Sequence, residues 1–143
     1  MKRLEQRSIS KILSANDTGE TGAHQAGILV PKQAEILSFF PPLPDNEQNP
    51  RHHLVFYDED DQRWEFAFIY YNNKFFGGTR NEYRLTRMTP YINLCGLEAG
   101  DEITLAHEPS GRYQIRYRRT KQPGRGKDGI LRLCSSWRVV DIE

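Results

Sequence analysis

The segment at residues 54–71 constrains the fold more than any other part of the chain, because it predicts a β-hairpin. Residues 54–57 form a short apolar run, and the acidic residues 58–61 that follow are typical of a tight turn between strands. The run after the turn alternates large aromatic side chains with charged or small ones: Trp64, Glu65, Phe66, Ala67 and Phe68. A period of two is that of a strand with one buried face, and residues 69–71 prolong it.

Further strands are expected between turn residues at five places: residues 28–30, 85–94, 101–107, 113–119 and 137–142. Pro31 is well placed to begin a short helix that runs to Phe40, and Pro41 ends it. We find no internal repeat and no linker, so residues 1–143 are expected to form a single domain. Many short strands with one or two short helices predict a mainly β fold, either a small barrel or an open, strongly twisted mixed sheet.

The charge balance excludes a polycation. The 143 residues carry a net charge of +1, so any binding of nucleic acid must depend on where the charges lie. The two cysteines, Cys95 and Cys134, lack the spacing of metal ligands and are too few for a secreted disulfide framework. No run approaches the ~20 apolar residues of a membrane span. We therefore expect a cytoplasmic protein that does not engage a membrane.

The segment at residues 74–87 carries the most specific chemical signal. If residues 79–85 are extended, the side chains of Arg80, Glu82 and Arg84 form one row. Arginine matches the O6 and N7 acceptors of guanine, and glutamate can accept a hydrogen bond from the N4 amine of cytosine. A patch meant only for phosphates would not contain a carboxylate. The alternative is a solvated edge strand whose charges pair with one another, and the residues alone leave both interpretations open.

A second polar segment, residues 14–27, reads as a loop with short side chains that offer donors and acceptors. The candidate DNA-contacting residues here are Asn16, Asp17, Thr18, Thr21, His24 and Gln25. Glycines at positions 19, 22 and 27 would allow close approach of the backbone to a ligand. The alternative is an Asx-type turn before a strand, with His24 as an exposed bystander.

A basic run at residues 112–127 contains seven positive charges and no acidic residue. Such a cluster can neutralise phosphates, although a charge run is also typical of a solvated face. The weaker candidates for phosphate contacts are Lys74, Arg118, Arg119 and Lys121.

Catalytic motifs are missing from the sequence. No acidic residue has Lys two positions later, which is the pattern of many magnesium-dependent nucleases, and the four histidines match no zinc or phosphodiesterase motif. His52 and His53 are interpreted as strand surface. The acidic residues 58–61 lack the spaced ligands of a calcium loop. We expect no catalytic residues, no metal site and no cofactor in this chain.

Several segments resemble a known family. Residues 13–27, 69–72 and 76–87 are similar to the N-terminal effector domain of EcoRII-like restriction endonucleases. UbaLAI, another enzyme that resembles this family, is one candidate for the protein from which the domain comes. Residues 28–32 and 96–105 are similar to the DNA-binding pseudobarrel of plant transcription factors such as the auxin response factors. The resemblance implies a seven-stranded open pseudobarrel. It also implies that two arms clamp double-stranded DNA from its major-groove side: an N-arm, residues 14–27, and a C-arm, residues 74–87.

The resemblance also implies roles for individual residues. In the N-arm, Asp17, Thr18, His24 and Gln25 match positions that contact the site. In the C-arm, the matching positions are Arg80, Asn81, Glu82 and Arg84, and Arg87 is a further candidate. The implied target is 5′-CCWGG, where W is A or T, and the row at Arg80 to Arg84 suits its G·C pairs. Some contacts are in doubt because the family has Lys, Lys and Trp where this chain has Gly78, Tyr83 and Met88.

The function implied is that of a targeting module in a type II, type IIE-like, restriction enzyme from a bacterium. The domain would bind DNA as a monomer without cleaving it. Magnesium-dependent hydrolysis would belong to a C-terminal nuclease domain that is missing from this chain. The alternative is the DNA-binding domain of a transcription factor with the same pseudobarrel.

Overall fold

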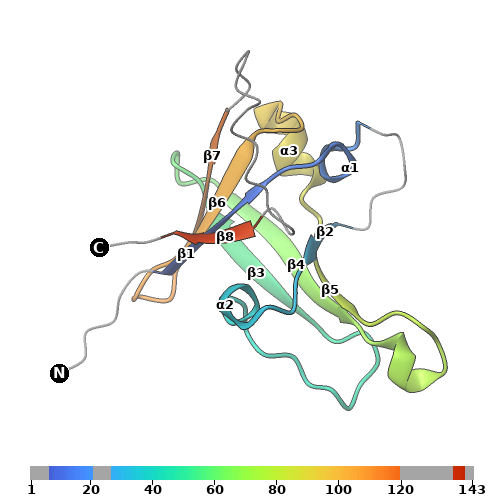
Figure 1. Cartoon of the computed structure of the whole chain (residues 1–143). Coiled ribbons are helices and arrows are strands. Elements are labelled where there is room, and N and C mark those ends of the chain that lie inside the picture. Colours follow the sequence, from blue (N-terminus) through green and yellow to red (C-terminus); the bar gives the residue numbers. More distant parts are fainter. Residues whose placement is uncertain (1–6, 21–26, 120–136, 141–143) are drawn as a thin grey trace.

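The computed structural model describes residues 7–20, 27–119 and 137–140, which form one curled sheet with short helices (Figure 1). The sheet order is β2-β5-β4-β3-β7-β6-β1-β8, and all neighbours are antiparallel except the parallel pair β3 and β7. The strands are β1 (Arg7–Ile12), β2 (Ile28–Val30), β3 (Arg51–Tyr57), β4 (Arg63–Tyr71), β5 (Glu82–Thr86), β6 (Glu102–His107), β7 (Tyr113–Arg118) and β8 (Trp137–Val140). The helices are α1 (Ala15–Thr18), α2 (Ala34–Leu37), the 3₁₀ helix η1 (Asn73–Phe76) and α3 (Thr89–Cys95).

The sheet is an open barrel whose edge strands are joined by a side chain. The indole Nε1 of Trp137 in β8 donates a hydrogen bond to the Leu29 carbonyl oxygen in β2, at 3.0 Å. The sheet order gives each of these two strands only one hydrogen-bonded neighbour among the described residues. The expectation of a mainly β pseudobarrel with short helices is therefore confirmed, with eight strands where seven were expected.

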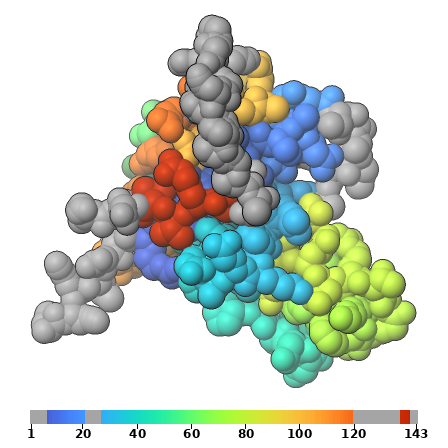
Figure 2. Space-filling model, viewed as in Figure 1, coloured from blue at the N-terminus to red at the C-terminus, as the bar shows by residue number. Residues whose placement is uncertain are grey.

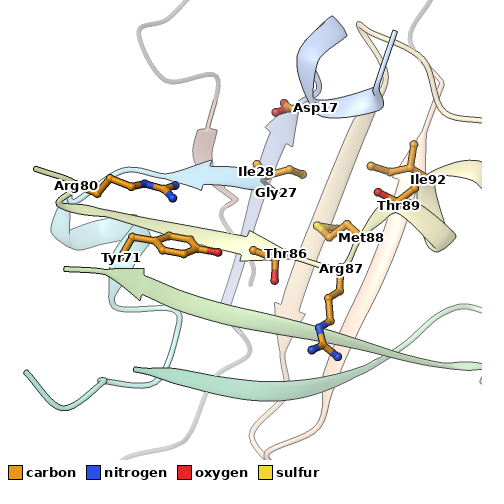
Figure 3. Close-up of a pocket in the computed structure, with 10 residues that line it drawn as sticks. All are labelled: Asp17, Gly27, Ile28, Tyr71, Arg80, Thr86, Arg87, Met88, Thr89 and Ile92. Atoms are coloured by element: carbon orange, nitrogen blue, oxygen red, sulfur yellow. The ribbon is translucent and has the colours of Figure 1, made fainter. Parts of the chain in front are cut away.

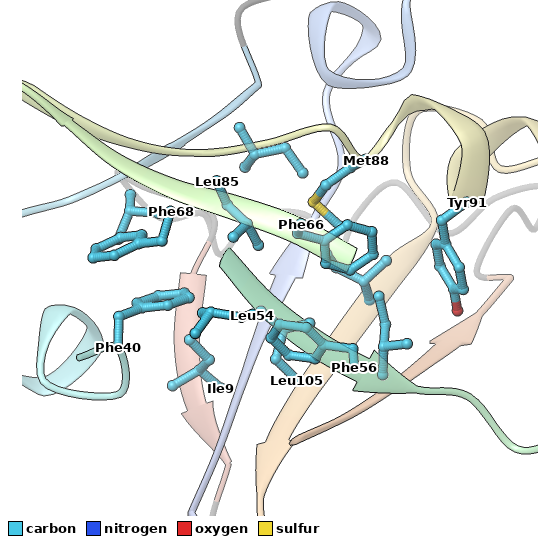
Figure 4. Close-up of a cluster of buried hydrophobic side chains, with 14 of the residues drawn as sticks. Ile9, Phe40, Leu54, Phe56, Phe66, Phe68, Leu85, Met88, Tyr91 and Leu105 are labelled. Atoms are coloured by element: carbon cyan, nitrogen blue, oxygen red, sulfur yellow. The ribbon is translucent and has the colours of Figure 1, made fainter. Parts of the chain in front are cut away.

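The central hairpin supplies the middle of the core (Figure 4). Phe56 in β3 and Phe66 and Phe68 in β4 are fully buried, as the alternation of the sequence predicts. After α2, the ring of Phe40 stacks on Phe68 with centroids 4.4 Å apart. In α3, the ring of Tyr91 meets Phe66 edge-on, with centroids 6.3 Å apart. The two short helices thus bring large aromatic side chains against different parts of one core.

The acidic turn of this hairpin is built by one carboxylate. Asp58 Oδ1 accepts hydrogen bonds from the backbone N–H groups of Asp60 and Gln62, at 2.8 and 2.9 Å, and Oδ2 accepts one from the Trp64 indole at 3.0 Å. Strand β3 begins at Arg51, three residues before the expected position, and His52 and His53 are exposed in it. The interpretation of the two histidines as strand surface is confirmed.

Strand β1 is missing from the expectations, and its burial explains why. It lies between β6 and β8, so it is covered by neighbours on both edges, yet it contains the polar residues Ser8, Ser10 and Lys11. All three are buried, and Ser10 donates a hydrogen bond to the Glu102 carboxylate at 2.8 Å. Polar side chains that find partners inside the fold hide the period-two pattern that reveals a strand.

Two further expectations are wrong in detail. Residues 85–94 do not form one strand: β5 ends at Thr86, and α3 begins at Thr89 with Pro90 in its first turn and ends at a left-handed Gly96. Residues 14–27 are not wholly a loop either. Ser14 and Asp17 form a reciprocal capping box that starts the short helix α1. In both places the residues that indicate a helix are those at its ends, and the periodicity of apolar residues does not reveal them.

The described residues contain neither a helix suited to a membrane nor a cluster suited to a metal ion. No helix there is long and apolar enough to cross a membrane. No three His, Cys, Asp or Glu side chains in those same residues are grouped so that they could hold a metal ion.

Candidate nucleic-acid interface

The two arms leave the sheet side by side. Strand β2 follows the N-arm and pairs with β5, the strand that ends the C-arm, in the register Ile28↔Leu85, Leu29↔Arg84 and Val30↔Tyr83. A hollow of about 350 Å³ lies where the arms meet the sheet (Figure 3). It is lined by Asp17, Gly27 and Ile28 on the N-arm side and by Tyr71, Arg80, Thr86, Arg87, Met88, Thr89 and Ile92 on the other.

The expected row of charged side chains exists. The register of β4 and β5 pairs Tyr71 with Glu82 and Ile69 with Arg84, so these side chains share the face opposite the buried Leu85. Glu82 Oε2 accepts hydrogen bonds from Arg80 Nη2 at 2.8 Å and from Arg84 Nε at 2.7 Å. The sequence left open whether these side chains face a base or pair with one another. In the structure, which contains no DNA, they form one row and pair with one another.

The two arginines of the row differ in their surroundings. The Arg80 side chain is 41% exposed, and its guanidinium lies over the Tyr71 ring at 4.0 Å. The Arg84 side chain is 20% exposed, and Arg84 Nη1 also donates to the Gly27 carbonyl oxygen at 2.8 Å. Arg84 therefore ties β5 to the end of the N-arm, whereas Arg80 keeps a larger surface for a ligand.

Glu82 is held in its ionised form. The Arg80 guanidinium, and after it that of Arg84, keeps the pKa of the Glu82 carboxyl below its usual value, against the opposing effect of partial burial. The carboxylate therefore acts only as a hydrogen-bond acceptor, which is the property needed to receive the N4 amine of cytosine.

The other C-arm residues occupy three different settings. Asn81 points to the opposite side of the row, where its side-chain oxygen accepts a hydrogen bond from the Tyr70 hydroxyl at 2.6 Å. Arg87 is exposed and lies at the bend between β5 and α3. Its φ is 67°, a backbone conformation that residues other than glycine seldom adopt. Lys74 is exposed in η1, with Nζ 5.9 Å from the centre of the Phe75 ring.

The N-arm residues divide into surface and interior. Asn16 is exposed on α1, and the Thr18 hydroxyl donates to the Ala15 carbonyl oxygen at 3.2 Å. The Asp17 carboxylate is buried and accepts hydrogen bonds from Lys11 Nζ at 2.8 Å and from the Ser14 N–H at 3.0 Å. Asp17 thus fastens the start of the arm to β1. The other three candidates, Thr21, His24 and Gln25, lie outside the described residues.

The described part of the basic run, residues 112–119, does not line this hollow. Arg118 donates to the buried Glu102 carboxylate at 2.6 Å, and Arg119 donates to the carbonyl oxygens of Gly96, at 3.0 Å, and of Cys95. Neither side chain lines the hollow between the arms. The remaining candidate for a phosphate contact, Lys121, lies outside the part of the chain that the structure describes.

Sequence reasoning missed several residues of this surface. Tyr71 supports Arg80, and the register Arg51↔Ile69 and His53↔Ala67 places two more exposed polar side chains on the same sheet face. Alternation within the hairpin could have placed Arg51 and His53 on one side. The pairing of β4 with β5 was needed to join that side to the charged row.

The family model described as "Restriction endonuclease EcoRII, N-terminal" matches residues 5–96, which include both arms. The chain belongs to this family. As a member of the EcoRII N-terminal family, it is 33% identical over 137 residues to the type II restriction enzyme EcoRII of Escherichia coli. That alignment covers 92% of this chain and 31% of the enzyme, so the domain spans less than a third of its relative.

Plant proteins are also similar to this chain. The B3 domain-containing transcription repressor VAL2 of Arabidopsis thaliana is 33% identical over 110 residues, which are 76% of this chain and 13% of the repressor. Its identity to this chain is thus as high as that of the bacterial enzyme.

Two solved structures share the fold of this EcoRII N-terminal domain. The UbaLAI restriction endonuclease B3 domain, crystallised with cognate DNA, superposes with a TM-score of 0.61 and 22% identity, covering 94% of this chain and 86% of that one. The Arabidopsis FUS3–DNA complex gives a TM-score of 0.59 and 24% identity over 78% of this chain and 96% of that one. These likenesses establish the B3 pseudobarrel fold.

Proposed function

We propose that this domain binds double-stranded DNA in a sequence-specific manner and serves as the effector or targeting part of an EcoRII-type restriction enzyme. The observation that carries the proposal is the row of Arg80, Glu82 and Arg84 beside the hollow between two arms. DNA hydrolysis would reside in a C-terminal nuclease domain of the longer protein, where Mg²⁺ would act. The domain itself would need no cofactor and would bind as a monomer in the bacterial cytoplasm.

The chemistry of the row favours G·C pairs. Arg80 presents guanidinium N–H groups from a position fixed by Tyr71, and these match the two acceptors of guanine. Glu82 presents a carboxylate to the amine of cytosine, at a point where arginines on both sides offset its repulsion of phosphates. We propose 5′-CCWGG as the target, with its outer pairs read by this row.

The remaining candidates would act around this centre. Asn81 and Arg87 lie beside the row on the C-arm, and Asn16 and Thr18 lie on the described part of the N-arm. The DNA contacts expected of Thr21, His24 and Gln25 stay predictions. We assign the weaker phosphate contacts to Lys74, Arg118, Arg119 and Lys121.

Arg80→Ala tests this function. We expect the variant to lose about 1–3 kcal/mol of binding free energy on a 5′-CCWGG duplex and little on a scrambled duplex, because a base contact discriminates between sequences. Fluorescence anisotropy of labelled duplexes measures both affinities. Lys74→Ala is the control, because Lys74 is exposed on the C-arm and loss of a phosphate contact should weaken both complexes alike. Equal losses on the two duplexes for Arg80→Ala would contradict base reading.

The target itself requires a separate experiment. Selection of bound duplexes from a random pool should enrich one pentanucleotide that has G·C pairs at both ends. Plasmid cleavage by this chain alone in the presence of Mg²⁺ would contradict the division between binding and catalysis.

A transcription factor domain is the second candidate. The 33% identity to the plant repressor VAL2 favours it, because B3 relatives occur in both classes of protein. Sequencing of the neighbouring gene region decides between them. A nuclease domain in the same reading frame supports the restriction enzyme, and a regulatory domain supports the transcription factor.

A further inference from the structure

The tip of the C-arm exposes two adjacent aromatic rings. Phe75 is 62% exposed and Phe76 is 45% exposed, both in η1. Among the large exposed hydrophobic side chains of the described residues, these two are the aromatic ones. The C-arm forms a lobe that projects from the body of the domain, yellow-green in Figures 1 and 2. The rings are therefore exposed on the surface, whereas the other five phenylalanines are buried in the core.

The tip is held in place before any ligand arrives. At its base, Asn72 is fully buried, accepts a hydrogen bond from the Asn49 N–H at 2.7 Å and donates one to the Glu47 carbonyl oxygen at 3.0 Å. Across the arm, the Lys74 N–H donates to the Arg80 carbonyl oxygen at 2.8 Å. A tip fixed in this way presents its rings without the entropic cost of ordering a loose loop on binding.

A turn with little room for side chains closes the tip. Gly77 has a φ of +94°, and a Cβ added to Gly78 would lie 2.8 Å from the Cβ of Asn73. The Gly78 N–H donates to the Asn73 carbonyl oxygen at 2.8 Å. Because glycine adopts positive φ at little cost and has no Cβ, these residues let the chain turn back directly after the two rings.

The charges around the rings favour DNA over a protein partner. Residues 73–81 contain Lys74 and Arg80 and no acidic residue. The Lys74–Arg80 hydrogen bond joins the base of the tip to the start of the charged row, so rings and row belong to one surface. A cation beside an exposed ring suits a groove, where phosphates line the edges and sugars and base edges form the walls.

We propose that Phe75 and Phe76 enter a groove of the bound duplex next to the base pairs that the row reads, and pack against sugars and base edges. This inference rests on the proposed DNA binding. The contact is apolar and releases no counterions, so it contributes affinity that does not depend on salt concentration. Lys74 at the same tip contributes the opposite kind of contact, which weakens as salt is added.

The test compares the affinity of variants for a 5′-CCWGG duplex at a series of salt concentrations. We expect the double variant Phe75→Ala/Phe76→Ala to bind about tenfold or more weakly, with an unchanged slope of log K against log salt concentration. Lys74→Ala should reduce that slope by about 1. Leu94→Ala is the matched control, because Leu94 is 67% exposed but lies on α3, outside both arms, and its affinity should stay at the wild-type value.

The outcomes separate this inference from the proposed function. If the wild-type domain prefers the 5′-CCWGG duplex to a scrambled one and the double variant binds as the wild type does, the tip contact is overturned while the function stands. A loss of affinity with a shallower salt slope also overturns an apolar contact. If the wild-type domain binds neither duplex, the proposed function falls and the inference with it. Equal urea midpoints for wild type and double variant establish that the exposed substitutions leave folding intact.

Discussion

Replacement of Asp17 by alanine should lower the stability of the domain without changing which DNA sequence it selects. The Asp17 carboxylate was a candidate DNA contact, but it lies inside the fold, with its side chain 9% exposed and that of its partner Lys11 7% exposed. It receives hydrogen bonds from Lys11 Nζ at 2.8 Å and from the N–H of Ser14, the residue that caps α1.

The magnitude follows from what the substitution leaves behind. The Lys11 ammonium would remain buried beside the Ile12 carbonyl oxygen, 3.1 Å away, without its carboxylate. Removing one member of a buried ion pair costs about 3–5 kcal/mol of folding free energy. We take this range to include the ~1 kcal/mol that is lost with the hydrogen bond at the helix cap. With a urea dependence of about 2 kcal/mol per molar, the unfolding midpoint should fall by roughly 2 M.

The assay is urea unfolding followed by tryptophan fluorescence, together with anisotropy on site and scrambled duplexes. Asn16→Ala is the matched control, because Asn16 is exposed on the same helix and should shift stability by no more than about 0.5 kcal/mol. The double variant Lys11→Met/Asp17→Leu should recover much of the lost stability, since neither buried charge then remains. An unchanged midpoint for Asp17→Ala, with affinity lost on the site duplex alone, would refute the reasoning and return Asp17 to the DNA interface.

Two further predictions concern the junction between the arms. Gly27→Ala should cost about 1–3 kcal/mol of stability, because the added Cβ would lie 2.6 Å from the Leu85 carbonyl oxygen and 2.9 Å from Thr86 Cα. Gly111→Ala is its control: the φ values are similar, +95° and +99°, but Gly111 has open space, so a larger urea shift for Gly27 measures the clash. Glu82 has a lowered pKa in the folded state, so its stabilising contribution is present above the unfolded value of about 4.5 and is lost as pH falls through the folded pKa. Glu82→Gln should therefore flatten the fall of the urea midpoint between about pH 5 and pH 3, and an unchanged acid profile would show that the carboxylate does not stabilise the fold.

The sequence determined those parts of the fold where side-chain chemistry and burial agree. The β3–β4 hairpin could be predicted because its aromatic residues alternate and its turn is acidic. Strand β1 could not, because Ser10 and Lys11 are polar side chains that are stabilised by distant partners, Glu102 and Asp17. Such partners become visible only once the fold brings them together.

The candidate site was predictable to a similar extent. Alternation alone placed Arg80, Glu82 and Arg84 in one row, and the structure adds that the row is internally paired. The support of Arg80 by Tyr71 depends on the register between β4 and β5, which residue types do not specify. The role of Asp17 likewise depends on burial, since the same carboxylate on the surface of an arm would have been free to meet DNA.

The hydrogen bond between Trp137 and Leu29 has a consequence for self-association. Edge strands with unpaired backbone groups can template the addition of a strand from another molecule, which leads to aggregation. Within the described residues the edges are short, with three residues in β2 and four in β8, and the Trp137 indole already donates to the Leu29 carbonyl oxygen that a neighbouring strand could bind. The described part of the sheet therefore offers a second copy of the domain little unpaired edge to which a strand could add.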